Sequence, residues 1–382
     1  MTHPTPTAGQ LTPTVRRLEW LMIVLWVAAA VAATVQQGIA HQNNNYLIFR
    51  EASLHLLRDQ DLYAAYPAVH FDLYKYSPTF ALLFLPFALL PFALSMLLWN
   101  VLNAAMLYVA VGTVLSRRGA LIARAVLFLD MLGSLQNVQS NALVAGLMIL
   151  AFAAYERRHS FTGSVAIALG TIIKVFPLAS ASFAIFHRRK LRVAVSLGVS
   201  FTVLVLLPLL VTPADTLMAQ YRSWRAVEAL DALERGFSVM QMLQHLLRQD
   251  WPNWPLQAAG VLALVAPVLV RHDRWSQWEF RRLYLCSVLV FCLIFNHQSE
   301  SPSFVIGVTG AAIWFASLTR RGRGTWAVFA FLVVCTILAS SDAMPVVLQK
   351  RVFDAYQFKV VPVIVVWVLV QVQLWRGARL AR

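Results

Sequence analysis

Long apolar runs alternate with short polar segments along almost the whole chain. The runs lie at residues 19–37, 92–115, 121–136, 142–155, 161–186, 193–211, 256–270, 283–296, 303–318, 325–341 and 360–375. A helix needs about 20 residues to cross the hydrocarbon core of a bilayer, and repeated runs of about this length are typical of membrane proteins. The pattern therefore predicts an all-α polytopic membrane protein.

Two apolar segments are too short for ordinary membrane spans. Residues 79–91 would form a helix of about 20 Å against a hydrocarbon core of about 30 Å, and they contain Pro86 and Pro91. We predict a re-entrant or interfacial helix there. Residues 161–186 would form a broken hairpin of two equally short arms, with Lys174 and Pro177 at its apex. With each arm counted, we expect about twelve membrane-embedded helices.

Basic residues cluster at every second boundary between the apolar runs. If the N-terminus is cytoplasmic, 21 of the 32 Lys and Arg face inward, accompanied by only four of the 17 Asp and Glu. The positive-inside rule therefore predicts that both termini are cytoplasmic. The net charge of +15 then reflects short inner loops that face anionic membrane lipids, and it does not indicate a nucleic-acid partner.

This orientation sets the expected domain organisation. We predict a disordered cytoplasmic tail at residues 1–18, one transmembrane domain at 19–375 and a basic cytoplasmic tail at 376–382. The first run lacks a small-residue cleavage site, so we expect it to be retained in the inner or plasma membrane. Outer loops are expected at 38–78, 212–255, 297–302 and 342–359. The short inner loops carry no P-loop, dinucleotide fingerprint or zinc-protease motif, so any chemistry is expected on the outer face.

The first outer loop combines aromatic residues with carboxylates. Asn45 opens an amphipathic segment that contains Glu51, and Asp72 precedes Tyr74 and Tyr76. Aromatic faces stack on sugar C–H surfaces and carboxylates accept hydroxyl protons, so this loop fits a sugar-binding cleft. An aromatic belt at the membrane surface is the alternative interpretation. A second amphipathic segment at 222–237 would form another interfacial helix beside the cleft.

Three further segments carry candidate binding residues. Gln139 and Asn141 lie in a polar run between two apolar runs, where amides at a helix N-terminus bind phosphate or hydroxyl groups; a solvated turn is the alternative. Lys174, at the hairpin apex, would hold a lipid phosphate or snorkel without a role. In the third segment, His297 could position a phosphate, and Glu300 could orient a hydroxyl or pair with Lys174, although such a turn can be simply solvated.

The order of these features resembles glycosyltransferase family 87, which uses polyprenol-phosphate sugars and has the GT-C fold. The matching features are Asn-aromatic-x-x-aromatic at 45–49, Tyr-x-Tyr-Ser-Pro at 74–78, Gln-x-Asn at 139–141, Lys-x-x-Pro at 174–177 and a late turn with His297. The resemblance extends from about residue 19 to 320. It implies a GT-C-like membrane enzyme that moves a hexose, often mannose, from a polyprenyl phosphate to a glycolipid or glycan acceptor on the periplasmic or extracellular face.

Asn45 departs from the family pattern. The family carries an aspartate at this position as general base, and an amide cannot accept the proton of the acceptor. Asp72 in the same loop is our first substitute as catalytic base, and Glu51 is the second. Lys174 and His297 would then neutralise the leaving phosphate.

Gln139, Asn141 and Glu300 would orient the sugar in this mechanism, which leaves retention and inversion of the anomeric centre both open. We expect no cofactor beyond the lipid-linked donor. Asp72, Glu51 and Glu300 could bind a divalent ion, but their spacing does not demand a metal. Three cysteines in apolar runs are expected to be free buried thiols: Cys286, Cys292 and Cys335.

Two other functions compete with the transferase interpretation. A transporter or flippase of a lipid-linked or polar solute would need polar residues near the bilayer midplane and an internal repeat. Only Asp130 and Lys174 lie at that depth, and the sequence has no convincing repeat. A non-catalytic membrane scaffold is compatible with the missing aspartate. We rank the transferase first, the transporter second and the scaffold third.

Overall fold

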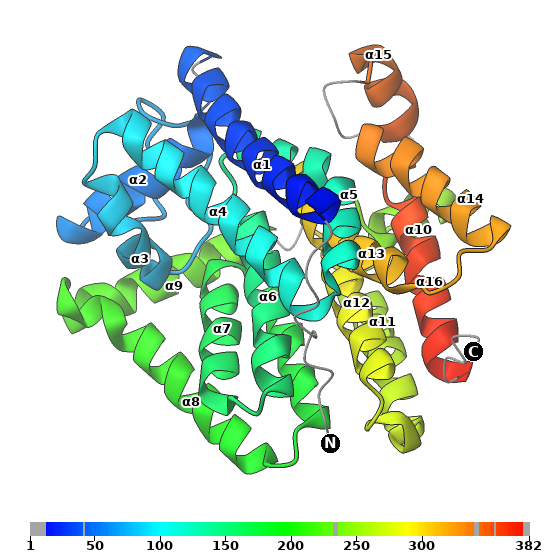
Figure 1. Ribbon diagram of the computed structural model, residues 1–382. Helices are drawn as coiled ribbons and strands as arrows, with labels where there is room; N and C mark the ends of the chain where they lie inside the picture. The colour runs from blue at the N-terminus through cyan, green and yellow to red at the C-terminus, as the bar shows by residue number, and fades with distance from the viewer. Residues whose placement is uncertain (1–12, 41–42, 232–235, 340–343, 355–356, 377–382) are drawn as a thin grey trace.

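The computed structural model describes residues 13–40, 43–231, 236–339, 344–354 and 357–376, and these residues form helices without a strand (Figure 1). The first half contains α1 (Pro13–Ala40), α2 (Asn44–Leu57), α3 (Pro78–Ala88), α4 (Phe92–Val114), α5 (Arg117–Gln136), α6 (Asn141–Glu156), α7 (Ser160–Ile173) and the 3-10 helix η1 (Phe176–Phe186). The second half contains α8 (Lys190–Leu206), η2 (Leu207–Leu210), α9 (Ala214–Asp231), α10 (Val239–Leu247), α11 (Asn253–Val270), η3 (His272–Arg274), α12 (Trp278–Ile294), η4 (Ser301–Ser303), α13 (Phe304–Ser317), α14 (Arg323–Leu332), η5 (Val333–Leu338), α15 (Val346–Leu348), η6 (Gln349–Asp354) and α16 (Val361–Arg376).

The core is built around α6, α12 and α13. Helix α6 packs between α4 and α7, α12 packs on α13 and α16, and α13 also contacts α5. Every residue from Phe304 to Phe315 of α13 is buried. A helix that is apolar on all sides belongs in the interior of a bundle, so the sequence of α13 explains its central position (Figure 1).

Helices α8 and α11 lie at the periphery and expose apolar side chains. On α8 the exposed residues include Val195, Val199 and Val203, and on α11 they include Leu262 and Leu269. Within the described residues, five helical segments are long and apolar enough to cross a membrane: Pro13–Gly38, Phe92–Val114, Arg117–Gln136, Lys190–Leu210 and Asn253–Val270. Helical membrane character is therefore confirmed, while the count of about twelve embedded helices stays a prediction.

The two short segments fold with the predicted lengths. Helix α3 has 11 residues with Pro86 inside it, and Pro91 caps α4. Helix α7 ends at Ile173, Lys174 is extended, and η1 begins one residue before Pro177. Proline lacks an N–H and fits the start of a helix, which explains why the hairpin restarts there. The re-entrant placement of α3 in a bilayer stays a prediction.

The tail boundaries need one correction. Helix α1 begins at Pro13, so residues 13–18 are helical and the prediction of a tail there is wrong. Proline is well suited to a first helical turn, and the apolar run continues the same helix. Residues 1–12 and 377–382 lie outside the described residues, as do Leu233 and Glu234 of the predicted second interfacial segment. The three cysteines are free thiols; Cys286 and Cys292 are buried, as predicted, whereas Cys335 is only partly buried.

Candidate functional site

A cavity of about 910 Å³ gathers polar side chains from segments that are far apart in the sequence. The start of α2, the loop before α3, the turn before α6, the break after α7, helix α9 and the loop after α12 all contribute to its wall. Its lining includes seven residues predicted as site residues: Asn45, Asp72, Tyr76, Gln139, Lys174, His297 and Glu300. The structure thus brings together most of the site expected from the sequence.

Gln139 is the centre of the polar network in this cavity. Its Oε1 accepts hydrogen bonds from Lys174 Nζ at 3.2 Å and from Asn141 Nδ2 at 3.1 Å. Its Nε2 donates to Glu300 Oε2 at 3.3 Å. Gln139 therefore separates the ammonium of Lys174 from the carboxylate of Glu300 and holds both groups at the cavity wall.

The turn that carries Gln139 has an unusual backbone. Val138 has a φ of 51°, in the left-handed region that a β-branched residue rarely occupies. Its N–H donates to Leu135 O at 2.9 Å, the N–H of Gln139 donates to Ser134 O at 3.1 Å, and Trp99 Nε1 donates to Val138 O at 3.3 Å. Such strain persists where surrounding contacts enforce it, often at functional sites. Here the contacts fix the direction of the Gln139 side chain.

Asn45 ties the start of α2 to the same turn. Its Nδ2 donates a hydrogen bond of 2.8 Å to Asn137 O. The neighbouring Asn44 accepts through Oδ1 from the N–H of Phe71 at 3.0 Å. These two amides connect the first turn of α2 to the two segments that carry Gln139 and Asp72.

Asp72 lies exposed in the loop between α2 and α3. Its Oδ1 accepts from the N–H of Leu73 at 2.9 Å, and His70 Nδ1 donates to its backbone carbonyl at 2.7 Å. The local hydrogen bonds fix the loop and leave the second carboxylate oxygen of Asp72 accessible to a ligand. An exposed, positioned carboxylate is suited to accept a proton from a hydroxyl.

Tyr76 and Tyr74 have different surroundings. Tyr76 lines the cavity, and burial raises its pKa, with the negative charges of Glu300 and Asp72 adding to the effect. Its hydroxyl therefore stays protonated at neutral pH. Tyr74 is buried behind it and donates to Ser77 O at 2.8 Å. Tyr74 supports the loop before α3 and does not line the cavity.

Lys174 stands in the break between α7 and η1, outside both helices. Burial lowers its pKa to about 8, while the carboxylate of Glu300 acts in the opposite direction. The ammonium is therefore mostly protonated at pH 7 and close to its titration range. A cation in this position can stabilise a phosphate that enters the cavity.

The loop that carries His297 is held by close backbone contacts. Gly236 N–H donates to His297 O at 2.5 Å, and Phe237 N–H donates to Ser299 O at 2.7 Å. A Cβ at Gly236 would overlap the backbone oxygen of Ser299, so only glycine fits there. Gln257 Nε2 lies 3.3 Å from His297 Nδ1 and helps to orient the imidazole.

The sequence of the chain matches a known family over the elements that build this cavity. A model of glycosyltransferase family 87 matches residues 74–295, which is more than half of the chain. The chain belongs to glycosyltransferase family 87. The match includes Tyr76, Gln139 and Lys174, whereas Asn45 and Asp72 precede it and His297 follows it. No curated protein matches the chain in a sequence search.

Besides Tyr74, two predicted residues of this glycosyltransferase lie outside the cavity lining, Glu51 and Asn141. Glu51 is 16% exposed and its Oε1 lies 3.7 Å from Arg50 Nη1. Asn141 is fully buried at the start of α6, where it contacts Gln139 from behind. Glu51 therefore does not line the cavity with Asn45, and Asn141 acts on the site through Gln139.

Sequence reasoning missed several residues that line the cavity. Glu228 and Trp224 of α9 contribute a third carboxylate, besides Asp72 and Glu300, and an aromatic wall. Trp224 Nε1 donates to Lys75 O at 3.3 Å. The sequence pattern predicts that both residues lie on an interfacial helix, but it does not show that their side chains line the cavity. Gln257 also escaped notice, although a polar side chain in the first turns of an apolar helix is a usable signal.

Proposed function

We propose that this glycosyltransferase moves a hexose, mannose in the first instance, from a polyprenyl phosphate to a hydroxyl of a glycolipid or glycan. The observation that carries the proposal is the convergence of Asp72, Lys174 and Glu300 on one cavity. Asp72 offers a base, Lys174 a phosphate partner and Glu300 an acceptor for sugar hydroxyls. A transporter would not need this set of groups in one place.

The proposed reaction breaks one bond at the anomeric carbon and forms another. The acceptor oxygen bonds to the anomeric carbon while the bond from this carbon to the phosphate oxygen breaks, and the leaving polyprenyl phosphate takes the electron pair. The acceptor proton passes to the carboxylate of Asp72. General-base assistance of this kind contributes about 100- to 10,000-fold in rate.

The leaving phosphate gains negative charge as the bond breaks. Lys174 Nζ, directed by Gln139 Oε1 at 3.2 Å, supplies a cation for this charge. His297 follows α12, lines the same cavity and adds a hydrogen-bond donor. Charge that develops in the transition state is best stabilised by groups already fixed in place.

The lining also contains an apolar part that suits a prenyl chain. Ile173 and Phe176 lie next to Lys174 in the chain, and Phe291 and Phe295 of the α12 segment also line the cavity. A lipid phosphate bound by Lys174 would place its first isoprene units among these side chains. This arrangement favours a lipid-linked donor over a soluble nucleotide sugar.

We place the active site on the periplasmic or extracellular face. The cavity lies at the N-terminal end of α6, next to Asn141, whereas Arg157 and Arg158 follow the C-terminal end of that helix. Arginine-rich loops favour the cytoplasmic side. The cavity at the other end of α6 then faces the side to which lipid-linked sugars are delivered.

Sugar transfer by the purified full-length protein tests this proposal. Polyprenyl-phosphate mannose with a labelled sugar is mixed with a membrane glycolipid extract, and transfer is compared between wild type and Asp72→Asn. We expect Asp72→Asn to lose at least 100-fold in kcat. Transfer by wild type that Asp72→Asn leaves intact would refute Asp72 as the base, and absence of transfer with any hexose donor would refute the donor class.

Three further variants and one treatment sharpen this experiment. Asp215→Asn changes an exposed carboxylate outside the cavity and should leave transfer unchanged. Glu51→Gln and Glu228→Gln examine the other two base candidates, and a loss confined to one of them would move the role of base to that residue. Since we propose no metal cofactor, incubation with EDTA should leave transfer at the wild-type rate.

A further inference from the structure

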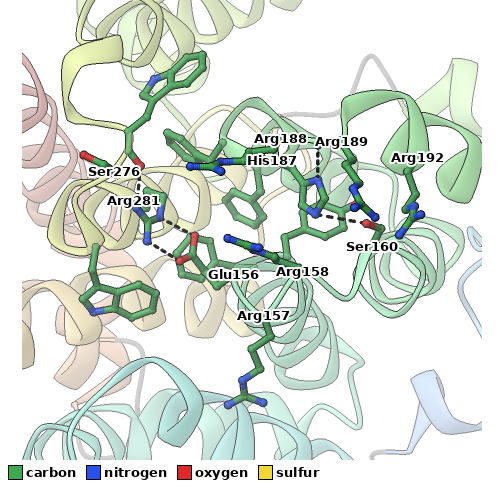
Figure 2. A pocket seen from close by; sticks show the side chains of 16 residues that line it. Glu156, Arg157, Arg158, Ser160, His187, Arg188, Arg189, Arg192, Ser276 and Arg281 are labelled. Atoms are coloured by element: carbon green, nitrogen blue, oxygen red, sulfur yellow. Dashed lines mark hydrogen bonds and ion pairs between the residues drawn. The ribbon is translucent and has the colours of Figure 1, made fainter. Parts of the chain in front are cut away.

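A second cavity of about 940 Å³ lies at the other end of α6, α7 and α12 (Figure 2). Helix α6 has 16 residues, so its two ends are separated by about 24 Å at 1.5 Å per residue. Arginines from three separate segments contribute to the lining: Arg157, Arg158, Arg188, Arg189, Arg192 and Arg281. The cavity is therefore distinct from the proposed glycosyl-transfer site.

The charge of this second cavity is strongly positive. Among the described residues that line it, Glu156 is the single carboxylate. Arg281 already neutralises Glu156 through two hydrogen bonds of 2.7 Å, from Nε to Oε1 and from Nη2 to Oε2, drawn as dashed lines in Figure 2. The other five guanidinium groups have no further carboxylate in the lining, and this excess charge favours an anionic ligand.

His187 lies among the charges of several of these arginines. It is buried, its Nδ1 accepts from the N–H of Arg189 at 3.1 Å, and its Nε2 lies 3.3 Å from Ser160 Oγ (Figure 2). Burial lowers the pKa of His187, and the nearby charges of Arg158, Arg189 and Arg192 lower it further. The imidazole is therefore neutral and serves as a spacer that holds the loop before α8.

Arg158 occupies a backbone position that normally belongs to glycine. It follows the last turn of α6 with a φ of 62°, and its N–H donates to Tyr155 O at 3.0 Å while the N–H of His159 donates to Ala154 O at 2.9 Å. Helices that end in this way commonly carry glycine at that position, because a side chain there is strained. Arginine at this position strains the backbone, but its guanidinium group can bind an anion.

Helix ends and aromatic side chains add to this anion site. The first turns of α7, α8 and α12 contribute Ser160, Arg192 and Trp278 to the lining, so the positive ends of three helix dipoles lie at this cavity together with the negative C-terminal end of α6. Aromatic rings form the apolar part of the lining, including Phe186 and Trp275. Next to Arg192, Leu191 of α8 is 78% exposed, as expected beside lipid.

We propose that this second cavity binds the phosphate headgroup of an anionic membrane lipid. The arginines hold the phosphate, and the aromatic rings and the exposed apolar face of α8 accommodate the glycerol and the upper acyl chains. A soluble phosphate compound would use the same guanidinium groups but would have no need of the apolar wall. Lipid bound here fastens the ends of α6, α7 and α12, whose other ends reach the first cavity.

The test measures lipid binding to the full-length protein in nanodiscs. The discs contain phosphatidylcholine and increasing fractions of phosphatidylglycerol, and binding is followed by native mass spectrometry and by the melting temperature. The double variant Arg158→Gly with Arg189→Gln should lower the affinity for phosphatidylglycerol about 100-fold or more, since each charge-assisted hydrogen bond to the bound phosphate contributes about 10-fold or more. The control, Arg320→Gln with Arg323→Gln, removes the same charge from another basic loop and should bind as wild type does.

Two comparisons distinguish lipid binding in this cavity from misfolding and from binding of free phosphate. In discs without phosphatidylglycerol, the melting temperature of Arg158→Gly alone should be no lower than that of wild type, because glycine relieves the backbone strain. Weaker lipid binding by this variant then cannot arise from misfolding. Inorganic phosphate, added at about 10 mM, should not displace the lipid. Equal loss of lipid binding in both double variants would overturn the cavity as the site, and stabilisation by free phosphate alone would overturn the lipid as its ligand.

Discussion

Replacing Asn45 with aspartate restores the residue that the resemblance to family 87 leads one to expect, yet we predict that activity falls. Asn45 Nδ2 donates a hydrogen bond of 2.8 Å to Asn137 O, in the turn that carries Gln139. A carboxylate has almost the same shape but no hydrogen to donate. Its oxygen would face the carbonyl oxygen, and the start of α2 would separate from the turn.

The size of the effect follows from this single contact. A lost hydrogen bond costs about 0.5 to 1.5 kcal/mol, and an acceptor left without its donor raises the cost to about 1 to 3 kcal/mol. Because Asn45 is only partly buried, water can reach the carbonyl, and we take about 1 to 2 kcal/mol. If this energy is lost from the transition state, kcat/KM falls about 5- to 30-fold.

The matched control changes the neighbouring residue. Asn44 uses its Oδ1 as an acceptor from the N–H of Phe71, and aspartate preserves that acceptor. Sugar transfer by Asn44→Asp should therefore stay near the wild-type rate while Asn45→Asp loses activity. A gain of activity in Asn45→Asp, or rescue of Asp72→Asn by Asn45→Asp, would refute the reasoning and make position 45 the site of the base.

Three further outcomes are expected. Gln139→Leu should weaken polyprenyl phosphate binding about 10- to 150-fold, and Lys174→Met should weaken it about 30- to 4000-fold. The double variant should bind no more weakly than Lys174→Met, because Gln139 acts through Lys174. This affinity, measured by equilibrium binding, should also fall once the pH rises above about 8, where Lys174 loses its proton. Arg281→Leu should lower the free energy of unfolding by about 3 to 5 kcal/mol, because it leaves the carboxylate of Glu156 unpaired. Arg281→Leu with Glu156→Leu removes both charges and should lower it much less, which thermal melting of the two variants would show.

Each of these outcomes has its own control. Additive losses for Gln139→Leu and Lys174→Met would show that the two residues act independently. In Lys174→Arg the side chain stays charged to high pH, so the affinity for polyprenyl phosphate should not change with pH between about 7 and about 10. This range extends from above the second pKa of phosphate to near the ordinary pKa of lysine. Asp273 is half exposed in its pair with Arg274, so Asp273→Asn should leave the melting temperature unchanged.

The sequence predicted the helical membrane class and most of the cavity because both follow from where polar residues interrupt apolar runs. Gln139 stands in the turn before α6, Lys174 in the break after α7 and His297 in the loop after α12. Helices that run antiparallel bring alternate helix ends to the same face. Polar residues at alternate boundaries therefore meet without any knowledge of the packing.

The placement of Glu51 was not predictable from the same reasoning. Asn45 and Glu51 both lie on α2 but are six residues apart, which at about 100° per residue turns them about 120° away from each other. Only one of them can face the cavity. Asn45 does, and Glu51 approaches Arg50 on another face. Proximity in the sequence was a weaker guide here than helical periodicity.

Glu228 and Gln257 were missed because their positions depend on packing between distant segments. Helix α9 returns to the cavity only through contacts such as the hydrogen bond from Gln220 Nε2 to Gln60 O at 2.8 Å, 160 residues apart in the chain. No local pattern encodes that return. The direction of the α9 side chains therefore required the tertiary structure.

The two cavities lie at opposite ends of the same helices, and polar or cationic residues at the helix ends line both of them. Helix α6 begins with Asn141 behind the proposed transfer site and ends before Arg157 and Arg158 at the second cavity. Fixed cations and the N-terminal ends of helices lie at each cavity, from α2 and α6 at the first and from α7, α8 and α12 at the second, alongside the C-terminal ends of α7 and α12 at the first and of α6 at the second. Both ends of the bundle are therefore suited to phosphate. The first adds carboxylates for chemistry on a sugar, whereas in the second Arg281 neutralises the one carboxylate of the described lining, which leaves a surface for binding alone.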